Sequence, residues 1–494
     1  MSTPTIPPFD PANVQGDILA GLPKRVQHYL LFQIGPDVRA FRKRLAVLIP
    51  QITTTTQVVG DRAKIAENKK AAADAGKAPG LLKLSGVNIA FSQFGLTKLG
   101  ITDNIGDTAF VGGQLNDAQN LADSGVVGSD GKFIPNWIPA FKQQLDGVVI
   151  ISGDSELTVT ATQAIVKGIF NVGAAKATMH EVQTIKGTVR PGKEKAHEHF
   201  GFLDGISQPA VKDFDKCPHP GQETVRQGVI LCGRENDVDA RTKQPVTRPP
   251  WALDGSFLAL RFLAQLVPEF NTFLEQNPIT STGLTPAAGS ELLGARLVGR
   301  WKSGAPIDVF PTADDPAAGV DPARNNDFRY TFPDDQTTQD RCPFAAHTRK
   351  TNPRADLEDP PISVSNENRR IIRRGVQFGP EVTPAEKAAK KTLHERGLIF
   401  AAYQSNIVNG FQFIQHSWAN NQNFPPKASA GVPTPGFDAI IGQDGNAITA
   451  RTLVGTDPSN QGAPLALVTE WVIPRGGEYF FSPSISALKS TFAL

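Results

Sequence analysis

The segment HEHFGFLDGISQP, which begins at His197, holds several residue types that support chemistry at close spacing. Gly201 and Gly205 bracket Asp204, and a glycine lets the backbone press against a flat ligand because it carries no Cβ. His197, His199 and Asp204 also offer imidazole and carboxylate ligands that suit non-haem iron or zinc. A mononuclear metal site is therefore one hypothesis, and ordinary hydrogen-bonded histidines on a turn are the commoner alternative.

Two further segments combine a histidine or arginines with small or apolar neighbours. RCPFAAHTRKTNPR sets His347 among small and basic residues, although a lone histidine is more often structural than a ligand. NRRIIRRGVQFG, from residue 368 to residue 379, places four arginines around two isoleucines. Such a pattern is typical of a solvated face or of arginines paired with carboxylates, so neither segment identifies a function by itself.

Length and composition limit the kinds of protein that can carry these segments. The chain has 494 residues, with 40% hydrophobic and 20% charged, which is typical of a globular protein with roughly two or three domain-sized units. The net charge is +2, from 50 basic and 48 acidic residues, so we expect no nucleic-acid partner. No apolar run approaches the roughly 18 residues that a membrane span requires, and the N-terminal segment lacks the pattern of a secretory signal.

The first part of the chain alternates short apolar runs with turn signals, which predicts a mixture of strands and helices. Residues 212–250 are rich in Pro, Gly, Asp and Arg and predict a long irregular connection, with a domain boundary nearby. The predicted elements are strands at 29–34, 86–91 and 147–151, a helix at 38–48, and a surface helix within 53–83.

The second part opens with a similar strand leading into a helix, at 255–268, so two sheet domains of one type are expected. Residues 304–361 show little periodicity and predict a long loop, of the kind that is usually functional. The remaining predicted elements are a core strand and helix at 397–407 and 411–414, and a final strand at 467–473. We therefore predict an α+β protein with domains at 1–240 and 241–494.

The order of the motifs GxxDG, CPFAAHTRKTNPR, IIRRG and GLIF resembles that of the fungal dye-decolorizing peroxidases. The segments NVQGDILAGLPK, FQFIQHSW and AIIGQDG are similar to the same family, so the resemblance extends from about residue 13 to the C-terminus. It implies two ferredoxin-like domains, with antiparallel sheets and peripheral helices, that enclose one haem b. The first would carry the distal GxxDG motif, and the second the proximal histidine and the distal arginine.

The resemblance assigns roles to the central residues. His347 matches the proximal ligand of the haem iron, and Asp438 is the expected partner of its other ring nitrogen, with a backbone carbonyl as the alternative. Asp204 matches the distal acid–base residue and Arg373 the distal arginine, with Arg374 as the alternative. In that family Asp204 would take a proton from H2O2, and Arg373 would stabilise the separating charge as an oxo-ferryl porphyrin radical forms.

Four more residues would surround the haem, and a fifth would act at the protein surface. Gly205 would allow its close approach, and Arg349 would pair with a propionate, with a surface salt bridge as the alternative. Leu398 and Phe400 alternate on one strand and match the apolar lining of the distal pocket, which admits peroxide but no bulky dye. Trp418 lies in the polar context QHSWANNQN, so we expect its indole to reach solvent. It matches the surface tryptophan at which the family oxidises large substrates, with an ordinary partly buried tryptophan as the alternative.

Three further expectations concern a radical site, the working pH and a second metal. Phe378 stands where many relatives carry a tyrosine, and phenylalanine cannot form a phenoxyl radical. An aspartate base stays deprotonated in acid where a histidine would not, so we predict an acidic working range. Oxygen ligands suit Mn(II), which leaves its oxidation open, although a solvated acidic loop is commoner, at Asp356, Glu358, Asp359 and Glu367.

The sequence thus predicts a haem peroxidase that uses H2O2 to oxidise anthraquinone and azo dyes and phenols in one-electron steps. The first alternative is a non-haem metal enzyme, and the second is a haem-binding or haem-handling protein that does not turn over peroxide. We expect a monomer or homodimer without nucleic-acid or membrane partners. Because the similar proteins act outside the fungal cell, an extracellular location is also expected.

Overall fold

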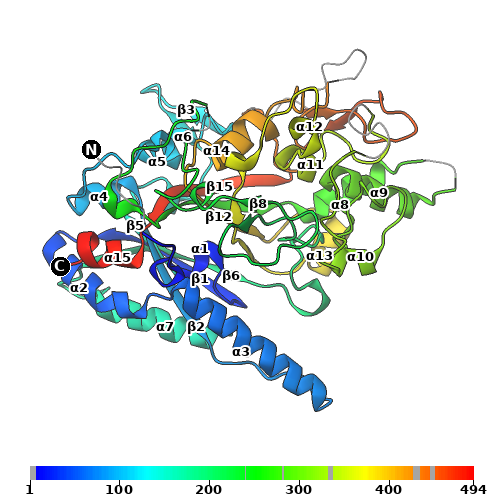
Figure 1. Cartoon of the computed structure of the whole chain (residues 1–494). Helices are drawn as coiled ribbons and strands as arrows, with labels where there is room; N and C mark the ends of the chain where they lie inside the picture. Colours follow the sequence, from blue (N-terminus) through cyan, green and yellow to red (C-terminus); the bar gives the residue numbers. More distant parts are fainter. Residues whose placement is uncertain (1–6, 240, 281–282, 332–337, 427–433, 446–450) are drawn as a thin grey trace.

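The computed structural model describes residues 7–239, 241–280, 283–331, 338–426, 434–445 and 451–494. Its centre is a nine-stranded sheet in which neighbouring strands run antiparallel, in the order β10-β12-β9-β15-β2-β5-β1-β6, with β11 also paired to β12 (Figure 1). Its strands are β1 (Val26–Ile34), β2 (Ser85–Phe91), β5 (Gly147–Gly153), β6 (Met179–Thr188), β9 (Ser256–Gln265), β10 (Ile372–Arg373), β11 (Val376–Phe378), β12 (Gly397–Gln404) and β15 (Val472–Ser482).

The sheet consists of two sets of strands that meet at one narrow contact. β1, β2, β5 and β6 come from the first part of the chain, and β9 to β12 with β15 come from the second. Between the sets, β15 pairs with β2 only at Phe481 and Phe91, whereas β15 and β9 pair over their whole length. The predicted boundary at residue 240 falls between β6 and β9 in the sequence, at a residue outside the described part of the chain.

The two ends of the sheet approach each other and close it into a barrel. Gly187 of β6 lies so near β11 that a Cβ on it would be 2.2 Å from Val376 Cγ1 and 3.2 Å from the Gln377 carbonyl oxygen. β6 and β11 are at opposite ends of the strand order. A side chain at residue 187 would therefore separate the edges, so glycine is required at this contact.

Both faces of the barrel wall are buried, because side chains alternate along each strand. On β1, Tyr29 and Leu31 belong to one apolar core, together with Leu258 and Leu260 of β9. The alternate residues of β1 pack instead in a second core with the helices α2 and α7. This double burial explains why the strands appear in the sequence as continuous apolar runs.

Helices cover the outside of the barrel. In Figure 1, α2, α3 and α7 lie together along the N-terminal half, and α8 to α13 surround the C-terminal half. The longer helices are α2 (Val38–Leu48), α3 (Thr55–Asp74), α7 (Glu156–Ile169), α8 (Val267–Gln276) and α9 (Pro286–Val298). The shorter ones are α1 (Gly16–Leu19), α4 (Gln93–Lys98), α5 (Thr108–Gly112), α6 (Gln114–Asp117), α10 (Pro316–Val320), α11 (His347–Thr351), α12 (Ala355–Glu358), α13 (Pro384–Ala389), α14 (Phe411–Phe413) and α15 (Ile485–Ala487).

Local sequence signals explain several helix boundaries. α3 begins with a capping box, in which the Thr54 hydroxyl accepts from the Gln57 N–H and the Gln57 side chain accepts from the Thr54 N–H. α9 ends at Gly299, whose φ of +90° favours glycine. Within the described residues, no helix combines the length and the apolar character that crossing a membrane requires.

Most predicted elements are confirmed, but the final strand is wrong. The predicted strand at 467–473 spans the end of β14 (Leu465–Leu467) and only the start of β15. β15 continues through Pro474, Gly476 and Gly477, with a register shift between Pro474 and Gly476. These residue types normally indicate a turn, but a Cβ at Gly476 would lie 2.0 Å from the Phe141 ring and one at Gly477 1.6 Å from the Gln114 amide.

The remaining strands form three small sheets, β3–β4 (Gly125–Val127 and Phe133–Pro135), β7–β8 (Ala210–Val211 and Thr224–Val225) and β13–β14 (Arg451–Leu453 and β14).

Candidate active site

A large cavity lies against the outer face of the C-terminal strands. It encloses about 1840 Å3, including the solvent at its mouth. Of the described residues that line it, those from the first part of the chain all belong to the loop 198–223, and the others come from the second part. His347, Asp204, Gly205, Arg373, Leu398 and Phe400, all predicted as site residues, line this one cavity.

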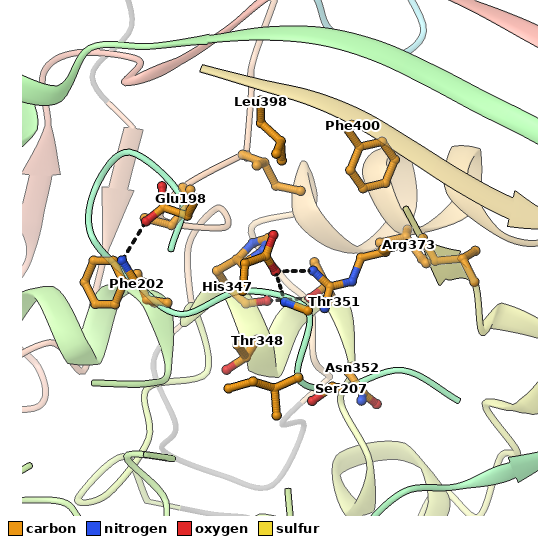
Figure 2. Close-up of a pocket in the computed structure, with 18 of the residues that line it drawn as sticks. Glu198, Phe202, Ser207, His347, Thr348, Thr351, Asn352, Arg373, Leu398 and Phe400 are labelled. Atoms are coloured by element: carbon orange, nitrogen blue, oxygen red, sulfur yellow. Dashed lines mark hydrogen bonds and ion pairs between the residues drawn. The ribbon is translucent and has the colours of Figure 1, made fainter. Parts of the chain in front are cut away.

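Strand register explains the apolar roof of the cavity. Leu398 of β12 pairs with Leu263 of β9, and Phe400 pairs with Arg261, so these four side chains share one face. The residue between them on β12, Ile399, points into the barrel core. Leu398 and Phe400 lie side by side above His347 in Figure 2, as the sequence alternation predicts.

His347 begins the one-turn helix α11 and is oriented by Asp438. Its Nδ1 lies 2.9 Å from Asp438 Oδ2, and Asp438 Oδ1 accepts from the backbone N–H groups of Ile440 and Ile441. Asp438 is fully buried, whereas the His347 side chain is 28% exposed, toward the cavity. Burial opposes ionisation of Asp438, but His347 and the two N–H groups hold the pKa of Asp438 below its ordinary value. The predicted carboxylate partner is therefore present, and Nε2 of His347 is the ring nitrogen left for a ligand.

Asp204 and Arg373 form an ion pair on the cavity wall. Arg373 NH1 donates to Asp204 Oδ1 at 2.6 Å, and the N–H of Gly205 donates to the same oxygen at 2.6 Å. Both side chains stay about one-third exposed, at 32% and 30%. Burial alone would raise the pKa of Asp204, but the Arg373 guanidinium and the Gly205 N–H hold it below its ordinary value. Asp204 is thus a carboxylate at any mildly acidic pH.

The loop that carries Asp204 is held by Glu198, a residue to which the sequence assigned no role of its own. Glu198 accepts from the N–H groups of Phe200 and Phe202 within the loop, and from Gln265 Nε2 on β9 (Figure 2). His199 is buried and contacts the Phe378 carbonyl oxygen through Nε2 at 2.8 Å. Glu198 and His199 therefore fix the conformation of the loop, although the sequence alone suggested metal ligands.

The non-haem metal hypothesis is wrong for this reason. His199 is committed to the Phe378 carbonyl, while His197 is half-buried and contacts the Lys195 carbonyl oxygen, so the two rings do not converge on Asp204. Among the described residues, no three His, Cys, Asp or Glu side chains gather in a way that would hold a metal ion.

Two predicted arginine roles need correction. Arg374 does not compete with Arg373, because its guanidinium donates to the carbonyls of Asp17 and Leu19 in α1. Arg349 does not line the cavity; it is fully buried and forms a two-bond ion pair with Asp356 at 2.7 and 2.8 Å. A propionate contact through Arg349 is therefore wrong, and so is the alternative of a surface salt bridge.

The prediction that the Trp418 indole reaches solvent is also wrong. Trp418 is 3% exposed and lies on the π-helix η8 (Ile414–Ala419), stacked on Phe424 with ring centroids 5.1 Å apart. Phe413 also packs against the indole, edge-on, with ring centroids 5.5 Å apart. The polar sequence context indicates a surface segment, but two aromatic neighbours cover the ring.

The acidic residues behind His347 already have basic partners. The ion pairs are Asp356 with Arg349, Glu358 with Arg329 and Arg370, Asp359 with Arg329, and Glu367 with Arg226. A Mn(II) site would have to displace these arginines. Phe378 stacks on Phe262 with centroids 4.3 Å apart, so this position is a packed aromatic pair.

The residues of this cavity fit a haem group. One histidine nitrogen faces the cavity while the other is tied to a buried carboxylate, which is the usual arrangement of a metal-binding imidazole. Gly205 has φ of +84°, and a Cβ built on it meets nothing within 4 Å, so this position leaves open space beside Asp204. Apolar side chains from Leu398, Phe400 and Ile440 provide walls suited to a flat macrocycle.

Comparisons with known proteins agree with this fit. The model of the DyP dimeric alpha+beta barrel domain matches residues 13–191. A dye-decolorizing peroxidase of Auricularia auricula-judae is 42% identical over 482 residues, which cover 96% of this chain and 86% of that protein. One of Exidia glandulosa is 43% identical, over 97% of this chain and 87% of that protein.

Solved structures show the same fold over nearly the whole chain. An ancestral D-type dye decolorizing peroxidase is 59% identical, with a TM-score of 0.90, and covers 99% of this chain and 100% of its own. A mutant of the dye-decolorizing peroxidase from Pleurotus ostreatus is 49% identical, with a TM-score of 0.92 and the same coverage. The domain limits, the oligomeric state and the extracellular location stay predictions. The fold, the ordered motifs and these similarities together show that the chain belongs to the dye-decolorizing peroxidases, a family of haem enzymes.

Proposed function

We propose that this chain binds one haem b in the cavity through His347 and oxidises aromatic substrates with H2O2. The observation that carries the proposal is that the Asp204–Arg373 pair and the Asp438-oriented His347 line one cavity. The bound haem would supply the iron that accepts oxidising equivalents from peroxide and passes them on one electron at a time. Asp438 makes His347 a stronger electron donor by holding a proton on, or shared with, Nδ1.

Asp204 is the base that accepts the proton of H2O2. Its carboxylate keeps a water-accessible position, and its low pKa ensures that it is deprotonated when peroxide arrives. Once protonated, it can return the proton to the departing oxygen, which leaves as water. Arg373, 2.6 Å away, carries a permanent positive charge that stabilises negative charge as the O–O bond breaks.

Leu398 and Phe400 limit what can reach the reacting oxygen. They form an apolar wall above His347, so small peroxide fits while large dyes must transfer electrons from farther away. Phenols and anthraquinone and azo dyes are the substrate classes that we propose. A related peroxidase, 42% identical, has been solved in complex with 2,6-dimethoxyphenol, which supports a phenolic substrate.

The absorption spectrum of haem-reconstituted protein tests the proposal. One equivalent of H2O2 at about pH 4, near the reference pKa of an aspartate, should decrease and broaden the Soret band, and an added phenol should restore it. A Soret band that does not respond would favour haem binding without peroxide turnover. Absence of any Soret band, or its presence unchanged in His347→Ala, would contradict the assignment of His347.

A further inference from the structure

Arg300 is a buried cation whose partners in the described part of the chain are all neutral. It directly follows Gly299 and is 4% exposed. NH1 donates to the carbonyls of Gly304 and Asn325, and NH2 donates to Ser207 Oγ at 3.0 Å and, more weakly, to Asn326 Oδ1 at 3.3 Å. Among the described residues, no carboxylate forms an ion pair with Arg300. A buried charge without a counter-ion is costly, so this arrangement favours an anion from outside the chain.

A second cation and a shared acceptor make the site of Arg300 still more favourable for an anion. Arg354 shares the acceptor Asn326 Oδ1, to which its NH2 donates at 2.5 Å, and Ser207 Oγ also donates to this oxygen at 2.7 Å. A single amide oxygen thus receives three donors, a task better suited to a full negative charge. Burial, with the repulsion of Arg354, lowers the pKa of Arg300 to about 9.

This cluster opens into the cavity beside His347. Arg300, Ser207 and Asn326 all line the cavity. Gly299 packs so closely on Thr348 that a Cβ there would lie 1.9 Å from Thr348 Oγ1, which places Arg300 next to the turn that begins with His347. Figure 2 shows Ser207 and Thr348 on the same side of His347. An anion held by Arg300 would therefore lie within the reach of a ligand bound to His347.

We propose that Arg300, assisted by the Ser207 hydroxyl, binds a propionate carboxylate of the haem; this inference rests on the proposed haem function. A guanidinium recognises a carboxylate through paired charge-assisted hydrogen bonds. The nearby carboxylates of the chain are already engaged, Asp204 by Arg373 and Glu223 by Arg370. The propionate thus supplies the counter-ion that the fold leaves out, a role that Arg349 cannot fill because Asp356 occupies it.

Haem and its dimethyl ester, in which both propionates are uncharged, separate this contact from general haem packing. The reconstituted proteins are mixed with excess apomyoglobin, and the rate of haem loss is followed in the Soret region. In the unchanged chain, we expect the ester to leave about tenfold faster or more than haem, since a charged hydrogen-bonded contact is lost. In Arg300→Gln, haem should leave at nearly the rate of the ester, and Arg300→Lys should lie between.

Arg370→Gln is the matched control, because Arg370 also lines the cavity but pairs with Glu223 and Glu358. It should keep the difference between haem and ester. Retention of that difference in Arg300→Gln, or its loss in Arg370→Gln instead, would overturn the proposal. Binding of the ester by Arg300→Gln shows that the variant is folded. If the unchanged chain bound neither compound, the haem function itself would fail; if it held both equally well, only the propionate site would fail.

Discussion

At the scale of single residues, the two key carboxylates of the site differ because their partners differ. Asp438 is fully buried and bonded to His347 and two backbone N–H groups, so it orients a ring. Asp204 is one-third exposed beside Arg373, so it can exchange a proton with a small molecule. In the function that we propose, the same type of side chain thus serves as a positioning residue in one place and as a base in the other.

Asp204→Asn should remove the base and leave the haem site intact. The amide is nearly the same size but cannot accept a proton at working pH, so the rate of reaction with H2O2 should fall by about 10²–10⁴-fold. The Soret band before peroxide should keep its intensity. Stopped-flow absorption measures both, with Asp130→Asn, at an exposed turn, as the control. A rate within a few-fold of the unchanged chain would assign the proton transfer to another group.

The rate of the peroxide reaction should persist in acid. The Arg373 guanidinium holds the pKa of Asp204 below its ordinary value in the folded protein, so the carboxylate stays deprotonated as the pH falls from about 6 to about 4. Activity should decrease only when the pH falls through that lowered pKa. The rate constant measured by stopped flow at each pH checks this, and a steep decrease between pH 6 and pH 4 would contradict the role of Asp204.

Residue types were predictable from the motifs, as was the Asp438 partner of His347, but the partners of the arginines were not. The pattern IIRRG does not distinguish two adjacent arginines; β10 does, because Ile372 faces the barrel core and the next residue faces the cavity. Arg374 then turns to α1, more than 350 residues away in sequence. No motif marks Arg300, because it stands out only once the fold shows that no described carboxylate pairs with it.

At the scale of elements, the π-helix η8 determines what Trp418 can do. The indole is covered by Phe413 and Phe424 and cannot stack directly on a dye. An electron could still pass through this thin aromatic layer. The sequence correctly predicted a helix near residue 411, but it could not show this cover, because the stacking partner Phe424 lies beyond the helix.

Trp418→Phe tests Trp418 as an electron relay while keeping an aromatic ring in the stack. If Trp418 passes electrons to the surface, turnover of a bulky anthraquinone dye should fall about tenfold or more, while 2,6-dimethoxyphenol turnover and the Soret response to H2O2 stay unchanged. Trp251→Phe is the control, since Trp251 packs on Phe481 and Phe492 on another part of the molecule. Equal losses for both substrates would indicate a packing role, and unchanged dye turnover would exclude the relay.

At the scale of the whole molecule, β15 connects the two halves. It pairs with β9 along its length and contacts β2 at Phe481 and Phe91. Its start, at Val472 and Pro474, lines the cavity. The apolar cores were predictable from periodicity, whereas this long strand was hidden by glycines whose close contacts only the fold reveals. A change that destabilises β15 should therefore destabilise both halves of the sheet and the cavity.

Glu478 of β15 makes that stability depend on pH. Its carboxylate is buried, and its donors among the described residues are the N–H groups of Gln114 and Tyr479; burial raises its pKa to about 7. The folded protein thus keeps a proton that the unfolded chain releases near pH 4.3. Since the unfolded state binds fewer protons in this interval, the free energy of unfolding should fall as the pH rises from about 4.5 to about 7.

Glu478→Gln removes this titration and keeps the side-chain oxygen that accepts the two N–H groups. Relative to the variant, the unchanged chain should lose about 3 kcal/mol of unfolding free energy between pH 4.5 and pH 7, and no more above that. Urea unfolding of the reconstituted protein at a series of pH values measures the difference, with Glu291→Gln, at an exposed position of α9, as the control. Parallel curves for Glu478→Gln and the unchanged chain would show that Glu478 ionises normally. If the unchanged chain instead gained unfolding free energy relative to Glu478→Gln as the pH rises, a nearby cation, and not burial, would set the pKa of Glu478.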